Sequence, residues 1–330
     1  MNTLLQDLRY GVRALLKSPG FALTAVLTLA LGIGATTAIF SLVNALLLRP
    51  LPVAEPGRLV QVEELRRGGE SEASYSHPRY AELRDGSGRV LAGLAAFGMG
   101  GMALRAGGQA EAVMGGYVSG NYFQVLGIDP EAGRFFGAAE DRPGSPGAVA
   151  VVSEHLWRTR FGGERSALGR TIHLNGQPVT VVGVAPRGFG GTFVAVQTDV
   201  WVPIAMYPRL NRREEEAVYE RGRLMWLSLF GRLQPGVSPE RAETVLGGVA
   251  RRSEPDLVRN PLPVGVRLQP LTGMPAQARG AVLGFMAMLL ATAGLVMLIA
   301  GTNVAGMLLA RATTRRREVA LRLAVGAGRG

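Results

Sequence analysis

Two long runs without a charged residue constrain the fold of this chain more than any other feature. The first run extends from Phe21 to Leu48 and the second from Ala281 to Ala310. A helix needs about 20 predominantly apolar residues to cross a bilayer, and both runs exceed that length. A core helix of a soluble protein rarely reaches this length without a charge. The sequence therefore predicts two transmembrane helices, over residues 21–48 and 281–310.

A cleaved signal peptide is the alternative reading of the first run, because Arg9, Arg13 and Lys17 form a positive region ahead of it. The apolar core of a signal peptide has about 7–15 residues, and the run found here is much longer. No convincing small-x-small cleavage site follows it. The pattern therefore favours an uncleaved membrane anchor.

Basic residues near the ends of the two runs predict the orientation of the chain. Three precede the first run, and a group of arginines that begins at Arg311 follows the second; Arg49 and Arg279 on the inner sides are sparser. Positive residues close to membrane spans stay in the cytoplasm. We therefore expect residues 1–20 and 311–330 to be cytoplasmic and residues 49–280 to lie outside the membrane.

The distribution of charge argues against nucleic acid as a partner. The chain has a net charge of +11, but residues 49–280 hold 27 basic and 23 acidic side chains, an ordinary mixed surface. A nucleic-acid-binding face would show a basic stripe interleaved with aromatic residues, and none is present. The sequence contains no cysteine, which excludes disulfides and thiolate metal sites.

The segment between the two runs has the pattern of an α+β domain. Residues 171–184 give the clearest signal, because two alternating apolar runs flank Asn175-Gly176, a dipeptide typical of a two-residue hairpin turn. Ser153 and Ser238 each precede a short helical pattern as candidate N-caps. Further strands are expected at 59–65, 198–204, 226–236 and 264–271, and further helices at 77–85 and 238–255.

No pattern in the sequence indicates catalysis or a cofactor. The three histidines, His77, His155 and His173, lack the spacing of a zinc site. A phosphate-binding G-x-x-x-x-G-K-[ST] loop is absent, and the only lysine is Lys17. We therefore predict no catalytic, cofactor or metal residue, and we expect the chain itself not to be an ATPase.

Several stretches resemble one family of membrane proteins. "LLQDLRYGVRALLKSPGFALTAVLTLALGIGATTAIFSLVNALLLRPLP" (Leu4–Pro52) resembles the start of MacB-type and FtsX-like ABC transporter permeases, in particular those without a fused ATPase. In those proteins an amphipathic helix lies on the cytoplasmic face before the first span, so the resemblance implies a cytoplasmic amphipathic helix over residues 1–20. "VSGNYFQVLGIDPEAGRFF" (Val118–Phe136), "VAVVSEHLWRTRFGG" and "GRTIHLNGQPVTVVGVAP" are similar to the periplasmic core domain of that family. "RATTRRREVALRLAVGAGRG" is similar to the start of its cytoplasmic segment between the second and third spans.

The resemblance implies an architecture for residues 49–280. In MacB-type proteins the periplasmic part has a split, βαβ-rich subdomain like the porter domains of efflux pumps, with a second subdomain inserted within it. Mapped loosely, residues 50–95 and 222–275 would form the split subdomain and residues 96–221 the insertion. The fold class expected is thus α+β, with two transmembrane helices flanking a large extracytoplasmic domain.

The segment that follows the second run would be the contact with an ATPase. Glu318 and Arg322 form a favourable i,i+4 pair on one helical face. From the residues alone, an interfacial helix that only anchors the chain is the plainer reading. The resemblance implies a coupling segment that receives force from a separate ATPase, and its candidate residues are Arg315, Arg316, Arg317, Glu318 and Arg322.

Small residues recur at four-residue spacing in both apolar runs. Ala30, Gly34 and Ala38 form one stripe, and Gly301 and Ala305 form another. Small side chains let helices approach closely in lipid, where packing drives their association. We expect these residues to line contacts between membrane helices.

The resemblance implies a permease subunit, or its N-terminal part, in the bacterial inner membrane. Its partners would be a separate ABC ATPase, membrane lipid and a second permease copy, identical or not. ATP hydrolysis would then move the periplasmic domain for export or efflux by mechanotransmission. The alternative is a non-transport, FtsX-like protein whose external domain regulates an envelope partner such as a cell-wall hydrolase. Family members continue beyond the position of Gly330 into further spans, so we expect this chain to correspond to their N-terminal part.

Overall fold

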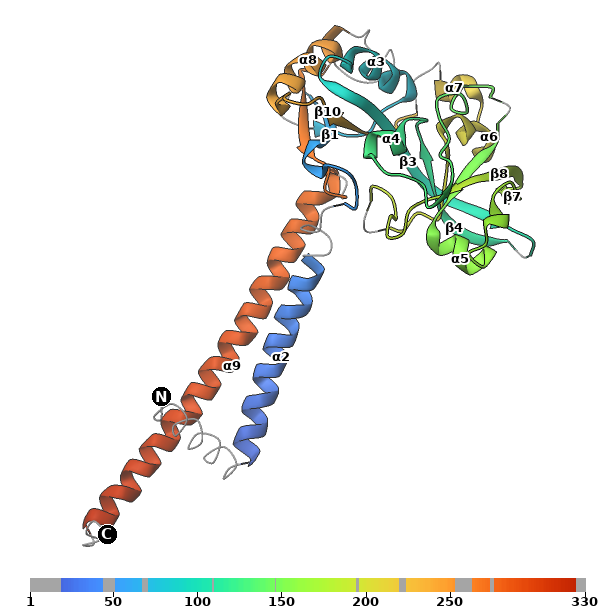
Figure 1. The fold of residues 1–330 in the computed structure, drawn as a ribbon. Coiled ribbons are helices and arrows are strands. Elements are labelled where there is room, and N and C mark those ends of the chain that lie inside the picture. The colour runs from blue at the N-terminus through green and yellow to red at the C-terminus, as the bar shows by residue number, and fades with distance from the viewer. Residues whose placement is uncertain are drawn as a thin grey trace. The chain divides into compact units, whose positions relative to one another are not determined.

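The computed structural model describes residues 19–43, 51–66, 71–108, 110–145, 147–193, 196–219, 224–252, 263–273 and 276–324. The chain divides into two compact units, which Figure 1 draws as ribbons. A helical unit comprises Met1–Ala45 and Gly280–Gly330, and a mixed unit comprises Leu46–Arg279. Most of the N-terminal helix expected over 1–20 lies outside the described residues.

The helical unit contains α2 (Pro19–Val43) and most of α9 (Ala276–Ala324). In the part of the chain that the structure describes, one stretch is long and apolar enough to cross a membrane, Gly280–Ile299 in α9. The apolar stretch of α2 is shorter, Val26–Ser41. The second apolar run therefore has the length of a membrane span, whereas two flanking spans stay a prediction.

The two helices approach each other at a glycine that the small-residue stripes do not include. Gly32 is buried, and a Cβ atom on it would lie 3.7 Å from the Cβ atom of Met297. The residues of the stripes, in contrast, are exposed in this chain: Ala30, Gly34, Ala38, Gly301 and Ala305. Gly32 and Gly34 are two residues apart and so lie on different faces of α2. The stripes stay a prediction of contacts with helices outside this chain.

The mixed unit is built on one sheet of eleven strands, counted over the described residues. The strands are β1 (Leu59–Leu65), β2 (Ser71–Glu72), β3 (Leu91–Arg105), β4 (Glu111–Val118), β5 (Ala132–Gly133), β6 (Val149–Val152), β7 (Thr171–Leu174), β8 (Gln177–Val184), β9 (Val200–Pro203), β10 (Ser228–Leu233) and β11 (Gly265–Pro270). The helices are α3 (His77–Ser87), α4 (Tyr122–Leu126), α5 (Glu154–Phe161), α6 (Tyr207–Asn211), α7 (Glu215–Tyr219) and α8 (Pro239–Arg252), with 3-10 turns η2 (Pro56–Arg58), η3 (Arg165–Ala167) and η4 (Ile204–Met206).

The first half of the sheet combines the two ends of the mixed unit. Its strand order is β11-β1-β10-β3, and all three pairings are antiparallel. Its connections are β1–α3–β3 and β10–α8–β11, which is the βαββαβ arrangement of ferredoxin-like folds with a long insertion after β3. Ser76 caps α3 by accepting a hydrogen bond from the Arg79 amide, and Ser238 accepts one from the Arg241 amide at α8.

The second half of the sheet is formed by the inserted residues. It continues in the order β4-β9-β6-β8-β5, with parallel pairings between β4 and β9 and between β6 and β8. The hairpin of β7 and β8 turns at Asn175 and Gly176, whose φ angles are 48° and 82°, as the sequence predicts. The boundary expected between residues 95 and 96 falls inside β3, so the two halves share one long strand.

Alternation along the strands produces two apolar layers. Val60, Val62 and Leu229 face the layer beneath α3 and α8, whereas Leu59 and Phe230 face the opposite layer. The opposite layer includes α4 and an aromatic group around Trp201 and Phe123. The mixed α/β character expected from the sequence is confirmed.

Candidate functional site: the arginine junction of the mixed unit

The first and last described segments of the mixed unit meet in one apolar cluster. Leu51 and Leu271 are 5% and 8% exposed, and both belong to the layer around Phe230. The Leu271 amide donates to the Leu59 carbonyl at 3.0 Å. Residues 51–58 follow α2 in the chain and Leu271 shortly precedes α9, so the two connections to the helical unit are anchored in the same layer.

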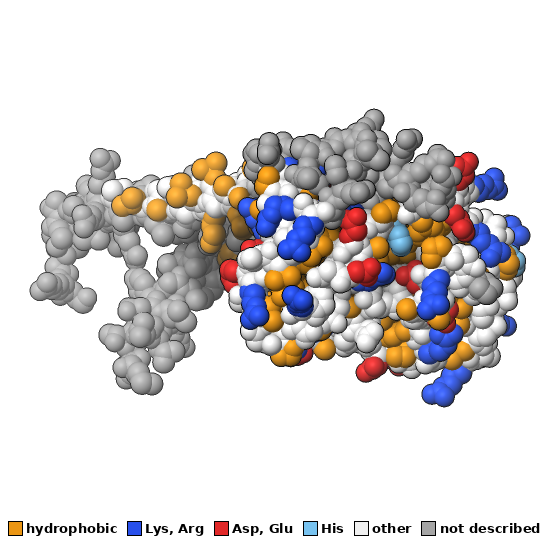
Figure 2. All heavy atoms as spheres, turned by 90° about the horizontal axis from the view of Figure 1, so that it is seen from above, with side chains coloured by type: hydrophobic (Ala, Val, Ile, Leu, Met, Phe, Trp, Pro, Cys, Tyr) orange, Lys and Arg blue, Asp and Glu red, His pale blue; other side chains and the backbone are white. Residues whose placement is uncertain are grey.

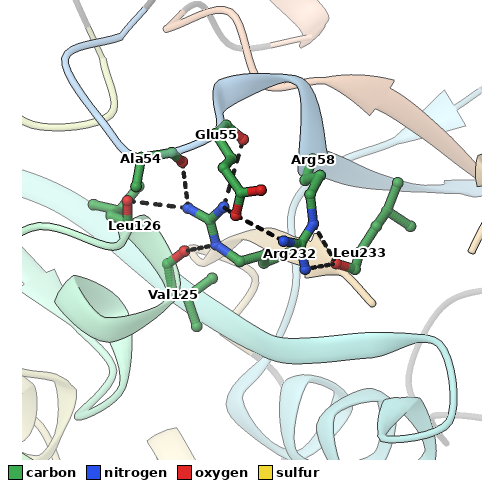
Figure 3. A network of polar contacts seen from close by, with 7 residues as sticks. All are labelled: Ala54, Glu55, Arg58, Val125, Leu126, Arg232 and Leu233. Atoms are coloured by element: carbon green, nitrogen blue, oxygen red, sulfur yellow. Dashed lines mark hydrogen bonds and ion pairs between the residues drawn. The ribbon is translucent and has the colours of Figure 1, made fainter. Parts of the chain in front are cut away.

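Arg232 of β10 connects residues 54–55, in the segment that follows α2, to the sheet (Figure 3). Its Nε donates to the Val125 carbonyl at 2.8 Å, and its Nη2 donates to the carbonyls of Leu126 at 3.1 Å and Ala54 at 2.7 Å. Its Nη1 lies 3.5 Å from the Glu55 carbonyl and 3.7 Å from the Glu55 carboxylate. One guanidinium thus joins β10, the end of α4 and the segment that follows α2.

Arg58 of η2 also joins the segment that follows α2 to β10. Its Nε and Nη2 donate to the Leu233 carbonyl at 3.1 and 2.7 Å, and its Nη1 donates to the Glu55 carboxylate at 2.7 Å. Glu55 therefore contacts both arginines. We refer to Ala54, Glu55, Arg58 and Arg232 with their carbonyl partners as the arginine junction.

The backbone at Glu55 is strained. Its φ and ψ are 43° and 61°, the left-handed conformation, and it precedes Pro56. Such a conformation in a residue other than glycine costs about 1 kcal/mol or more, and it persists only where the surroundings hold it. The contacts that hold this turn include the ion pair of Glu55 with Arg58, the hydrogen bond from the Arg58 amide to the Glu55 carbonyl, and the hydrogen bond from Arg232 to Ala54.

Burial dominates the electrostatics of Arg232. It lowers the pKa of the guanidinium; the positive charge of Arg58 acts in the same direction, and Glu55 opposes both. An arginine nonetheless stays charged in proteins, so it is held here chiefly by carbonyl dipoles. Multiple donors in a rigid planar fork are what a lysine could not supply at this position.

The arginine junction consists of two guanidinium groups, their carbonyl acceptors and the Glu55 carboxylate. Among the described residues no group of three or more histidine, aspartate or glutamate side chains could hold a metal ion. Through the contacts of the junction, residues 54–58 are joined to β10, an inner strand of the sheet, and to the end of α4.

The candidate residues proposed from the sequence lie elsewhere. Arg315, Arg316, Arg317, Glu318 and Arg322 all belong to α9, in the helical unit. α9 is one unbroken helix of 49 residues, so this segment continues the second apolar run directly instead of forming a separate interfacial helix. Sequence reasoning missed Arg232, although an arginine at an inward position of the apolar strand "SLFGRL" was a usable signal.

The amino-acid sequence matches the family of the MacB-like periplasmic core domain over residues 22–248. The macrolide export ATP-binding/permease protein MacB of Burkholderia pseudomallei is 29% identical over 212 residues, which is 64% of this chain and 29% of that protein. The protein of the same name from Salmonella paratyphi A is 26% identical over 231 residues, 68% of this chain and 32% of that protein. The chain thus spans about three tenths of the length of these curated relatives.

Solved extracytoplasmic domains are similar at low identity. The periplasmic region of MacB from Actinobacillus actinomycetemcomitans is 14% identical, covers 64% of this chain and 87% of that one, and gives a TM-score of 0.44. The extracellular domain of the transporter YknZ, from Gram-positive bacteria, is 15% identical, covers 64% and 99%, and gives 0.46. The family match, in contrast, covers well over half of the sequence. The chain therefore belongs to the MacB-like periplasmic core domain family and carries the extracytoplasmic domain of a MacB/FtsX-type ABC permease.

Proposed function

We propose that the chain is a permease subunit, or the N-terminal part of one, that couples ATP hydrolysis on a separate ATPase to movement of its mixed unit outside the membrane. The observation that carries this proposal is the family match over residues 22–248, which begins inside the first apolar helix. The sequence contains no phosphate-binding loop of its own. The relatives are ATP-binding/permease proteins for macrolide export, and export is the activity proposed here.

The proposed topology has two spans, α2 and the apolar part of α9, in the bacterial inner membrane, with both termini cytoplasmic. The mixed unit then lies in the periplasm as a porter-like split subdomain with an inserted second subdomain. The split β1–α3–β3 and β10–α8–β11 connections support this arrangement. A second permease copy, identical or not, and membrane lipid complete the proposed assembly.

The proposed path of force uses α9 and the arginine junction. A helix that continues without a break from Ala276 to Ala324 can carry a displacement along its axis. Five residues separate β11 from α9, so its motion would reach the edge of the sheet directly. In the connection from α2 to β1, Arg232 holds residues 54–55 against β10 and α4. Both connections would then move the sheet together.

Charge reversal in the coupling segment tests the proposal. We expect Arg315→Glu/Arg316→Glu/Arg317→Glu to reduce co-purification of an ABC ATPase with the full chain from native membranes by about tenfold or more, because complementary charge at an interface is replaced by repulsion. The measurement is ATP hydrolysis in the purified complex, together with identification of P-loop peptides by mass spectrometry.

The matched control reverses two arginines that are exposed on α8, Arg241→Glu and Arg252→Glu. It should leave the bound ATPase unchanged. Full ATPase recovery with the 315–317 variant would contradict the placement of the contact, and absence of any ATPase from the wild-type complex would contradict the proposed function.

A further inference from the structure

A run of consecutive charged residues connects two short helices of the mixed unit. The sequence Arg212-Arg213-Glu214-Glu215, continued by Glu216, is the longest such run between residues 46 and 279. It follows α6 directly and ends inside the first turn of α7. Residues 212–215 are all exposed. We refer to these four residues, two basic and then two acidic, as the charged segment.

The backbone of the charged segment is held in place from both sides. The amides of Arg212 and Arg213 both donate to the Pro208 carbonyl, the second at 2.9 Å. Before the segment, Leu210 of α6 is buried, and after it Val218 of α7 is buried. The four charged side chains therefore extend into solvent from a backbone that packing and hydrogen bonds fix.

Arg212 has a backbone conformation that favours glycine. Its φ and ψ are 51° and 46°, the left-handed region, at the position directly after α6. Glycine is the usual residue there, because a side chain is strained in this conformation. Among the residues that the structure describes, none forms an ion pair or a side-chain hydrogen bond with the Arg212 guanidinium. Contacts inside the described part of the chain thus give no reason for an arginine at this position, which points to a contact outside it.

The charges of the segment are not neutralised within the described part of the chain. Neither the two arginines nor Glu214 and Glu215 form an ion pair there, although opposite charges are adjacent in the sequence. Figure 2 shows basic and acidic side chains next to one another at the edge of the mixed unit. A partner with one sign of charge, such as a phosphate-rich surface, would be attracted by one half of the segment and repelled by the other. The partner that fits presents acids opposite the arginines and bases opposite the glutamates.

We propose that the charged segment is a contact between the mixed units of two copies of this chain, with a two-fold axis between Arg213 and Glu214. The axis places Arg212 opposite the partner's Glu215. It likewise places Arg213 opposite the partner's Glu214, so every charge of the segment meets one of opposite sign. A two-fold contact uses the same patch on both subunits and must be complementary to itself, which the order basic-basic-acidic-acidic satisfies. The inference rests on the second permease copy of the proposed function and takes that copy to be identical.

The strength of such a contact depends on how the copies are held together. Exposed ion pairs are individually weak, so the segment alone would not join two chains in dilute solution. Two chains anchored in one membrane are at a high effective concentration, at which weak contacts form. Salt screens exposed charges, so we expect the contact to weaken as the ionic strength rises.

Carbodiimide coupling of the full chain in membranes tests the contact. This reagent forms an amide between a lysine amine and a carboxylate that touch, and the only lysine of the chain is Lys17. Arg213→Lys keeps the charge and adds a reactive amine to the segment. We expect covalent dimers in which the peptide around position 213 is joined to Glu214 of a differently tagged copy. Their yield should fall about tenfold in about 0.5 M salt.

The matched control places the lysine at another exposed arginine. Arg241 lies on α8, outside the charged segment, and is exposed. Because Arg241→Lys keeps the charge but has no carboxylate of the partner opposite it, we expect about a tenth or less of the covalent dimer.

A charge-exchange pair tests the complementarity itself. One copy carries Arg212→Glu/Arg213→Glu, so that its segment is wholly acidic; the other carries Glu214→Lys/Glu215→Lys, so that its segment is wholly basic. Expressed together, they should couple as a heterodimer. The basic variant expressed alone should give about tenfold less covalent dimer, since like charges then face each other.

The outcomes separate this contact from the proposed function. Failure of two differently tagged wild-type chains to co-purify would overturn both the contact and the permease pair of identical copies. Co-purification without coupling at position 213 would overturn the contact alone. The same holds if Arg241→Lys couples equally well, or if the basic variant couples as well alone as with its acidic counterpart.

Discussion

Replacement of Arg232 by methionine should lower the free energy of unfolding of the mixed unit by about 3–5 kcal/mol. The variant removes the donors of the carbonyls of Val125 and Leu126, which are buried residues, and of Ala54, which is exposed. A buried acceptor left without a donor costs about 1–3 kcal/mol, and the costs here add in part. The apolar methionine side chain fills some of the vacated volume, so a cavity contributes little.

The change can be measured on the full chain, because all three tryptophans, Trp157, Trp201 and Trp226, lie in the mixed unit. Their fluorescence during guanidinium unfolding in detergent reports this unit selectively. The control is Arg267→Met, an exposed arginine of the adjacent part of the sheet, for which we expect a change within about 0.5 kcal/mol. Equal midpoints for the two variants would contradict the role given to Arg232.

A second substitution of Arg232 separates the effect on stability from the effect on coupling between the helical unit and the sheet. Arg232→Lys keeps the charge but lacks the planar fork, so it can reach fewer of the carbonyls that the guanidinium joins. We expect the lysine variant to fold and to loosen residues 54–55 selectively, visible as faster amide exchange there. The arginine junction would then be the first place to test whether movement of the helical unit reaches the sheet.

The sequence predicted local elements of the mixed unit well where they had their own signals. The hairpin at Asn175-Gly176 and the serine-capped helices α5 and α8 follow from residues adjacent in the chain. The strand β3 had no such signal, because "GMGGM" in its centre has low β-propensity. Other segments pack directly against the glycines of β3: a Cβ atom on Gly98 would lie 2.4 Å from the ring of Trp226.

The contacts of the arginine junction could not be predicted from local patterns, although Arg232 itself stands out in its apolar strand. Its contacts join residues that are far apart in the sequence, such as Arg232 with Val125 and Ala54. Neither "PVAEPGR" nor "GRLQPG" contains a recognisable binding motif. Asp141 is a further example, since its carboxylate accepts hydrogen bonds from amides at the ends of two separate strands. Such sites form where the fold brings distant segments together. For this chain, only the resemblance to a known family, and not the local sequence pattern, pointed to that fold.

Replacement of Arg79 by methionine should also cost about 3–5 kcal/mol at neutral pH, because it leaves a buried carboxylate without its partner. Arg79 lies 2.6 Å from the Glu64 carboxylate, and the two side chains are 14% and 8% exposed. Its Nη2 also donates to the Ala250 carbonyl at 3.0 Å, so one arginine of α3 ties β1 to α8. This is the half of the sheet that β11 connects to α9.

The loss should shrink in acid, and a double-mutant cycle should identify its cause. Burial already raises the pKa of Glu64, and Arg79 provides the largest opposing effect, so the variant should raise this pKa further. A raised pKa means that the folded state gains a proton more readily than the unfolded state, and stability lost at pH 7 returns as pH falls through it. Glu64→Leu combined with Arg79→Met should recover about 2 kcal/mol or more of the single-variant loss, since neither charge of this buried pair is left. A double variant as unstable as Arg79→Met alone would show that the bond to Ala250, and not the ion pair, holds α8 on the sheet.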